Sequence, residues 1–159
     1  MKAELPVFFL KPGELFASGS PYKIKTLLGT CVSICLFDKA LKIGGMNHFM
    51  LPSGRPDPDL PAKYGDYALQ YLLDELRKLG SKQHSLQAKV FGGADNTTGF
   101  ARSSKIGERN VETALELLEF EKIQVIAQNT GGNQGRKIFY YTNTGNVYMK
   151  FLTPDPYVL

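Results

Sequence analysis

The chain has 159 residues, of which 43% are hydrophobic and 21% are charged. This length and composition suit one compact domain over residues 1–159 and argue against an intrinsically disordered protein. The net charge of +4 favours an acidic partner. The Lys and Arg residues are scattered along the sequence, without the basic stripe typical of nucleic-acid binders, so we expect no nucleic-acid partner.

The first residues, MKAELPVFFLKPGELF, contain one short apolar run that Lys11 and Pro12 interrupt. This run is too short for a signal peptide or a membrane-spanning helix, and no later segment is long enough to cross a bilayer. We therefore expect a cytoplasmic protein that does not insert into the membrane.

Three strands are expected next, over residues 23–26, 31–37 and 42–51. The last two, CVSICLF and KIGGMNHFML, flank the turn segment DKAL, which predicts an antiparallel hairpin. With the turn centred between Lys39 and Ala40, Leu36 faces Ile43 and Cys31 faces His48. Directly opposed residues share one face of the sheet, so this register brings a sulfur and an imidazole together.

The second half of the chain alternates helices and strands. Four prolines over residues 52–65 predict a surface loop. Leucines at helical spacing predict a helix from an Asp66 N-cap to a stop at Gly80, and we expect Asn110 to cap a second helix that runs through Leu118. Strands are expected over 86–91, 122–128, 137–141 and 147–152. This order predicts an α/β domain in which helices cover mixed β-sheet.

The chain has two cysteines, Cys31 and Cys35. On one strand they lie roughly 13 Å apart. A disulfide needs Cα atoms within about 7 Å, so we expect no bridge. A metal site is also not expected, because the chain lacks a second group of Cys and His ligands. Cys35 suits core packing, whereas for Cys31 both burial and reactivity remain open.

A pair formed by Cys31 and His48 supports nucleophilic acyl transfer. An imidazolium beside the thiol raises the thiolate fraction, and His48 then protonates a leaving amine and activates water. Backbone N–H groups around Gly29, Thr30 and Cys31 are the expected oxyanion donors. Thr26 is the nearest candidate to fix the imidazole tautomer. The same pattern also suits an ordinary buried hairpin, so the residues alone leave both interpretations open.

Several blocks of sequence resemble, in order, the CheD family of chemoreceptor glutamine deamidases: LLGTCVSICLFD, GGMNHFMLP, KYGDYALQYLLDEL, KVFGGADN, KIGERNVETALELLE and NTGGNQGR. The resemblance runs from about Ile24 to Lys150. It implies a layered sandwich of mixed β-sheets flanked by helices, similar to the deamidating bacterial toxins. It also implies a cysteine-hydrolase mechanism without metal or cofactor, in which Cys31 matches the nucleophile and His48 the general base.

The third triad member of the family is a threonine, which in some members lies six residues before the cysteine. This chain has Lys25 at that position and Thr26 one residue later, so Thr26 is the residue expected in the role.

The resemblance implies hydrolysis of specific glutamines to glutamate on methyl-accepting chemotaxis receptors, with a CheC-type phosphatase as a further partner. Two alternatives remain open. In the first, the chain is mainly a non-catalytic regulatory module that binds receptors or a CheC-type phosphatase. In the second, it is a cysteine amidohydrolase or transglutaminase-like enzyme that acts on another protein.

Overall fold

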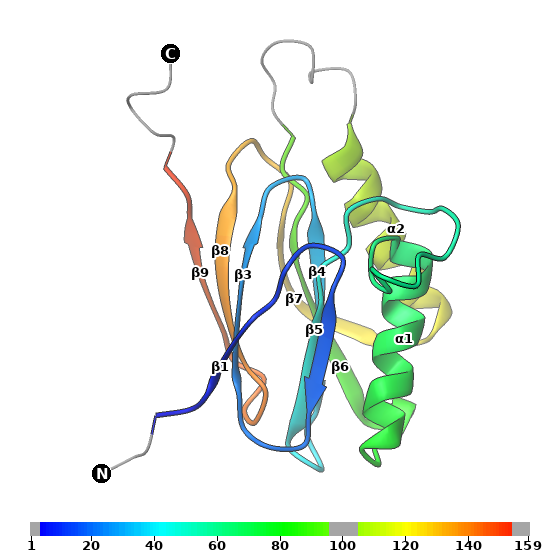
Figure 1. Ribbon diagram of the computed structural model, residues 1–159, viewed down its shortest axis with the longest axis vertical. Coiled ribbons are helices and arrows are strands. Elements are labelled where there is room, and N and C mark those ends of the chain that lie inside the picture. The colour runs from blue at the N-terminus through cyan, green and yellow to red at the C-terminus, as the bar shows by residue number, and fades with distance from the viewer. Residues whose placement is uncertain (1–3, 96–104, 154–159) are drawn as a thin grey trace.

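The computed structural model describes residues 4–95 and 105–153. They form three layers: a four-stranded sheet, a five-stranded sheet, and two helices on the outer side of the five-stranded sheet (Figure 1). The expected α/β architecture of mixed sheets flanked by helices is therefore confirmed. Neither helix is long and apolar enough to cross a bilayer, as judged over the described residues.

The four-stranded sheet has the strand order β1-β3-β8-β9, with the bounds β1 (Val7–Phe9), β3 (Lys23–Leu28), β8 (Arg136–Tyr141) and β9 (Val147–Phe151). β1 is parallel to β3, and the other pairs are antiparallel. Residues alternate along β3: Ile24, Thr26 and Leu28 are buried against the second sheet, while Lys23, Lys25 and Leu27 face outward.

The five-stranded sheet has the order β2-β5-β4-β6-β7, with the bounds β2 (Leu15–Ser18), β5 (Ile43–Asn47), β4 (Val32–Asp38), β6 (Leu86–Gly92) and β7 (Gln124–Thr130). β6 and β7 are parallel, and the other pairs are antiparallel. Both faces of this sheet are covered, so β4 is buried along almost its whole length.

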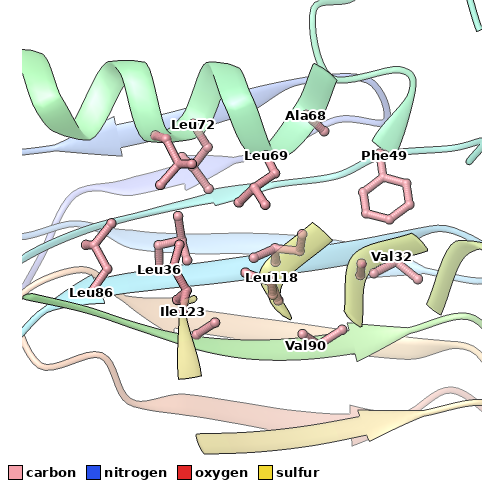
Figure 2. Close-up of a cluster of buried hydrophobic side chains, with 14 of the residues drawn as sticks. Val32, Leu36, Phe49, Ala68, Leu69, Leu72, Leu86, Val90, Leu118 and Ile123 are labelled. Atoms are coloured by element: carbon pink, nitrogen blue, oxygen red, sulfur yellow. The ribbon is translucent and has the colours of Figure 1, made fainter. Parts of the chain in front are cut away.

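The two helices are α1 (Gly65–Lys78) and α2 (Ile106–Phe120), and a short 3₁₀ helix covers Gln83–Ser85. Their apolar sides pack on the five-stranded sheet in the cluster that Figure 2 shows, which includes Phe49, Leu69, Leu72, Leu118 and Val32. A second apolar cluster, with Ile24, Met46, Ile138 and Tyr140 among its members, fills the space between the sheets.

The predicted helix starts were wrong. Tyr64 is the N-cap of α1, and Asp66 lies within its first turn. α2 begins five residues earlier than expected, after Lys105, and Asn110 is an interior residue of that helix. Instead, Asp95 caps α2: its carboxylate accepts the backbone N–H groups of Gly107 and Glu108 at 2.8 and 3.0 Å. The stop at Gly80 is confirmed, since α1 ends at Lys78 and Gly80 has a φ of 98°.

The predicted hairpin register was wrong by two residues. Leu36 pairs with Gly45 rather than Ile43, and Val32 bridges to Phe49. Lys42 donates its backbone N–H to the Asp38 carbonyl at 2.8 Å and takes a left-handed φ of 55°. The turn therefore spans four residues instead of two. Cys31 does not face His48 directly.

Two strands were not predicted. β1 and β2 lie in the first eighteen residues and contain only three and four residues each. Each is an edge strand of its sheet. Strands this short carry too little alternation to be recognised beside Pro6 and Pro12.

Candidate active site

Residues 29–31 form the loop that joins β3 to β4 and carries Cys31. The Gly29 carbonyl accepts the Ala94 N–H at 3.0 Å, and the Cys31 carbonyl accepts the Gly93 N–H at 2.9 Å. Within the described residues, the N–H groups of Gly29 and Thr30 have no backbone acceptor. The carbonyls are thus held on one side of the loop, and the N–H groups stay available for a developing negative charge.

Cys31 is half-buried at the end of this loop, and both cysteines are free thiols. Burial raises the pKa of the Cys31 thiol above its usual value, and the backbone N–H of Cys31 opposes that rise only in part. Cys35 is fully buried between the sheets, and burial raises the pKa of its thiol much further. Cys35 is therefore an inert core residue, as its apolar neighbours in the sequence indicate.

His48 follows β5 and is held by its backbone. Its N–H donates to the Glu14 carbonyl at 3.0 Å, and its carbonyl accepts the Gly13 N–H at 2.8 Å. The side chain lies between the sheets and is 1% exposed. Because burial disfavours the charged ring, the pKa of His48 falls to about 4.

Thr26 contacts His48 across the two sheets. The Thr26 hydroxyl oxygen lies 2.7 Å from His48 Nδ1 and also donates its proton to the Leu10 carbonyl at 2.7 Å. A carbonyl can only accept, so the single hydroxyl proton belongs to the Leu10 bond. Nδ1 must then carry the ring proton and donate it to Thr26. The imidazole is fixed as the Nδ1–H tautomer, with a lone pair on Nε2.

Cys31 and His48 share the face of the five-stranded sheet that points toward Thr26. Val32 and Phe49 form a bridge and belong to the cluster under the helices, so the residues that precede them point to the opposite face. The shift of two residues in register preserves that face. Cys31 and His48 are therefore diagonal neighbours, a relation in which residues are typically about 7–8 Å apart and their Cβ atoms somewhat closer.

The electrostatics differ from the expected thiolate–imidazolium pair. Burial lowers the pKa of His48 and raises the pKa of Cys31, so both shifts favour the neutral forms. At neutral pH the resting site holds a thiol and a neutral imidazole. Within the described residues, His48 Nε2 has no hydrogen-bond partner, which leaves its lone pair free to accept a proton.

Asn110 was expected only as a helix cap, but it joins the two halves of the site. Its Nδ2 donates to the Thr30 carbonyl at 2.9 Å and to the Met50 carbonyl at 3.0 Å. Thr30 belongs to the loop of Cys31, and Met50 follows His48 by two residues. One side chain of α2 therefore holds both segments. The sequence offered no signal for this role, since a polar residue near a helix start reads first as a cap.

No group of three or more His, Cys, Asp and Glu side chains within the described ranges is arranged to hold a metal ion.

Comparison with known proteins gives consistent matches. A family model described as CheD chemotactic sensory transduction matches residues 50–151. The "Probable chemoreceptor glutamine deamidase CheD" of Janthinobacterium sp. (strain Marseille) is 41% identical over 145 residues, which cover 89% of this chain and 71% of that protein. The protein of the same name from Stenotrophomonas maltophilia (strain K279a) is 41% identical over 143 residues, 90% of this chain and 72% of its own.

Among solved structures, a Neisseria meningitidis protein assigned to the DUF152 family is similar with a TM-score of 0.49 and 12% identity. The match covers 80% of this chain and 64% of that chain.

Proposed function

The chain belongs to the CheD family of chemotactic sensory transduction proteins, and from this premise we propose that it hydrolyses glutamine side chains of chemoreceptors to glutamate. The relatives named above carry the name of that activity. In this proposal the chain works in the cytoplasm, Cys31 is the nucleophile, His48 the general base, and Thr26 the residue that orients the base.

One observation carries the proposal. The Leu10 carbonyl, the Thr26 hydroxyl and His48 Nδ1 form a hydrogen-bonded series that leaves a lone pair on a buried Nε2. This nitrogen lies on the same sheet face as a half-buried thiol. An unpaired buried polar atom costs about 1–3 kcal/mol, and a role of Nε2 as a base accounts for this cost. A buried base without a partner is the state that a general base needs before its substrate arrives.

The first half-reaction removes ammonia. As Sγ attacks the side-chain carbonyl carbon of glutamine, Nε2 of His48 accepts the thiol proton, and the carbonyl electrons move to oxygen. The N–H groups of Gly29 and Thr30 stabilise this oxyanion. When the carbonyl re-forms, the C–N bond breaks, the imidazolium donates its proton to the leaving nitrogen, and ammonia departs. A thioester between Cys31 and the former glutamine remains.

The second half-reaction consumes one water molecule. Nε2 accepts a proton from water as the oxygen adds to the thioester carbon. The tetrahedral intermediate then expels sulfur, which takes the proton back from His48. The products are glutamate on the receptor and the original neutral thiol and imidazole, so glutamine and water are converted to glutamate and ammonia.

The test is an assay of ammonia release from a purified cytoplasmic fragment of a chemoreceptor. Mass spectrometry of the same fragment should show a gain of about one mass unit at each modified glutamine. We expect turnover by the wild-type chain, no turnover by Cys31→Ala, and nearly full turnover by Cys35→Ala, which serves as the matched cysteine control. Binding of the fragment without ammonia release by the wild type would instead identify a regulatory module.

A further inference from the structure

The outer side of the four-stranded sheet concentrates positive charge. We define the basic face as the outward side chains that surround Phe139 on this sheet: Lys23, Lys25, Lys137, Lys150 and Tyr148. None of the four strands contains an Asp or Glu residue. Figure 1 shows both helices on the far side of the other sheet, so neither covers this face. Lysines that are scattered along the sequence therefore lie together on one face of the folded protein.

The ammonium groups of the basic face lie close to one another and lack counter-ions. Nζ atoms of Lys23, Lys137 and Lys25 lie 4.6, 5.3 and 5.8 Å from the centre of the Phe139 ring. Repulsion, chiefly from Lys25, lowers the pKa of Lys137. Within the described residues, the two salt bridges are both on α1 and involve none of these lysines. An anionic partner would relieve this repulsion.

The face also carries exposed apolar side chains. Phe9, Leu27 and Tyr148 are 49%, 45% and 60% exposed. Exposed aromatic residues are enriched at protein interfaces. The Phe139 ring is already surrounded by ammonium groups, so it is not free to stack on a nucleic-acid base. This arrangement favours an acidic protein segment with apolar side chains over a single-stranded nucleic acid.

The basic face is continuous with the candidate active site. Strand β3 carries Lys25 and Leu27 on its outer side and Thr26 on its inner side, and it runs directly into Gly29 and the loop of Cys31. A segment that lies along the outer side of β3 therefore reaches the end of the strand from which the loop of Cys31 starts. The two surfaces are linked by one strand.

We propose that the basic face docks an acidic segment of the protein substrate and thereby delivers a neighbouring glutamine to Cys31. This inference rests on the proposed function for its occupant. The lysines of the face contribute substrate affinity, and the chemical step belongs to Cys31 and His48.

The test compares two quadruple variants of equal charge. In the first, Lys23, Lys25, Lys137 and Lys150 are each replaced by Gln. In the control, the exposed lysines Lys39, Lys42, Lys82 and Lys122 are each replaced by Gln. All four control lysines lie at turns or helix ends outside the four-stranded sheet. Binding of the receptor cytoplasmic fragment is measured with both sets in a Cys31→Ala background, so this arm does not depend on turnover.

We expect the face variant to weaken binding by about tenfold or more and to flatten its salt dependence, while the control stays within about twofold of the parent. With Cys31 restored, the loss in kcat/KM should fall on KM rather than on kcat. Equal binding by both variants would overturn the docking proposal. So would preferential binding of a single-stranded oligonucleotide by the parent chain, or self-association that only the face variant abolishes.

The two proposals fail in different ways. Charge-dependent binding without ammonia release would refute the deamidase function and leave the docking face intact. Ammonia release with the same KM in both variants would refute the docking face and leave the deamidase function intact.

Discussion

The Thr26 hydroxyl has one proton and two neighbours, the Leu10 carbonyl and His48 Nδ1, each at 2.7 Å. Because the carbonyl cannot donate, the Thr26 hydroxyl must donate to Leu10, and His48 Nδ1–H must donate to the Thr26 oxygen. The backbone carbonyl of Leu10 thus selects the tautomer of the base. Neither Leu10 nor its carbonyl carries a sequence signal, because any residue provides such an oxygen.

The first prediction concerns a variant that lacks this hydroxyl but has a side chain of nearly the same shape. Thr26→Val leaves Nδ1–H without an acceptor, so the ring can rotate or change tautomer. We expect kcat to fall roughly 10- to 100-fold, equivalent to about 1.4–2.7 kcal/mol of barrier. Receptor deamidation kinetics provide the measurement.

Thr26→Ser is the matched control, since it restores the hydroxyl, and it should retain most of the wild-type kcat. His48→Ala should be close to inactive. Wild-type kcat in Thr26→Val would mean that another group orients the imidazole.

The second prediction concerns acid. His48 acts as a base only when neutral, and its pKa is about 4 rather than the usual 6.5. We therefore expect kcat/KM to stay high below pH 6 and to fall with a midpoint near pH 4. An acid limb centred at pH 6.5 would contradict the burial of this ring.

The same titration affects folding. Between pH 6.5 and about 4 the unfolded state binds more protons at His48 than the folded state does. The free energy of unfolding therefore has its full value above about pH 6.5. It falls by about 3 kcal/mol as the pH drops through this window. Denaturant unfolding at several pH values measures the effect, and His48→Gln should show a shallower decline.

At the scale of elements, α2 sets the geometry of the site from behind. A Cβ built on Gly107 would lie 2.5 Å from the Gly93 carbonyl oxygen, so only glycine lets the start of α2 approach the segment after β6. Gly93 and Ala94 of this segment donate their N–H groups to the loop of Cys31. The close contact allows Asn110, one turn along α2, to reach Thr30 and Met50. The two hydrogen bonds of Asn110 therefore depend on the close approach of α2 that Gly107 permits.

The third prediction tests the two hydrogen bonds of Asn110. Asn110→Ala leaves two partly buried carbonyl oxygens without their donor, at a cost of about 2 kcal/mol in unfolding free energy. The loop of Cys31 and the segment after His48 then move independently, and we expect kcat to fall about tenfold or more.

Leu118→Ala, in the core of the same helix, provides a control of similar destabilisation, about 2–5 kcal/mol. At a temperature where both variants are fully folded, the Leu118 variant should retain its kcat. Equal kcat in the two variants would show that Asn110 contributes only stability.

Periodicity predicted both helices and most strands, because burial on one face imposes a regular spacing of apolar residues. The hairpin register depended on turn chemistry that periodicity does not contain. Asp38 accepts the N–H of Leu41 through its side chain at 2.9 Å and that of Lys42 through its carbonyl at 2.8 Å, which stabilises a four-residue turn. The error was an even number of residues, so the prediction that Cys31 and His48 share a face survived it.

At the scale of the whole molecule, the layers separate charge. The two helices together contain seven Asp and Glu residues, whereas the strands of the four-stranded sheet contain none. The lysines of the basic face come from segments more than a hundred residues apart, which the pairing of β3 with β8 brings together. Linear charge patterning could not reveal this, because strand order is set by the tertiary fold.

The fourth prediction concerns the contact between the sheets at the end away from Cys31. The buried Tyr140 hydroxyl donates to the Leu36 carbonyl at 2.7 Å and so links β8 to β4. We expect Tyr140→Phe to lower the free energy of unfolding by about 1–2 kcal/mol, with kcat preserved. Chemical denaturation measures the change. Tyr148→Phe, at a 60% exposed position, should leave the free energy of unfolding unchanged. An equal decrease in that variant would show that the buried hydrogen bond of Tyr140 adds no particular stability.

The strand order β1-β3-β8-β9 also bears on protein synthesis. Thr26, Cys31 and His48 leave the ribosome about a hundred residues before β8, the strand that pairs with β3 along its whole length and begins at Arg136. Before then, β3 has only the three-residue β1 as a partner, and two strands of this size are not stable alone. A nascent chain therefore holds every candidate catalytic residue long before it can hold Thr26 against His48. Synthesis must therefore proceed beyond β8 before the chemistry can begin, and products cut short before β8 would carry the thiol without an oriented base.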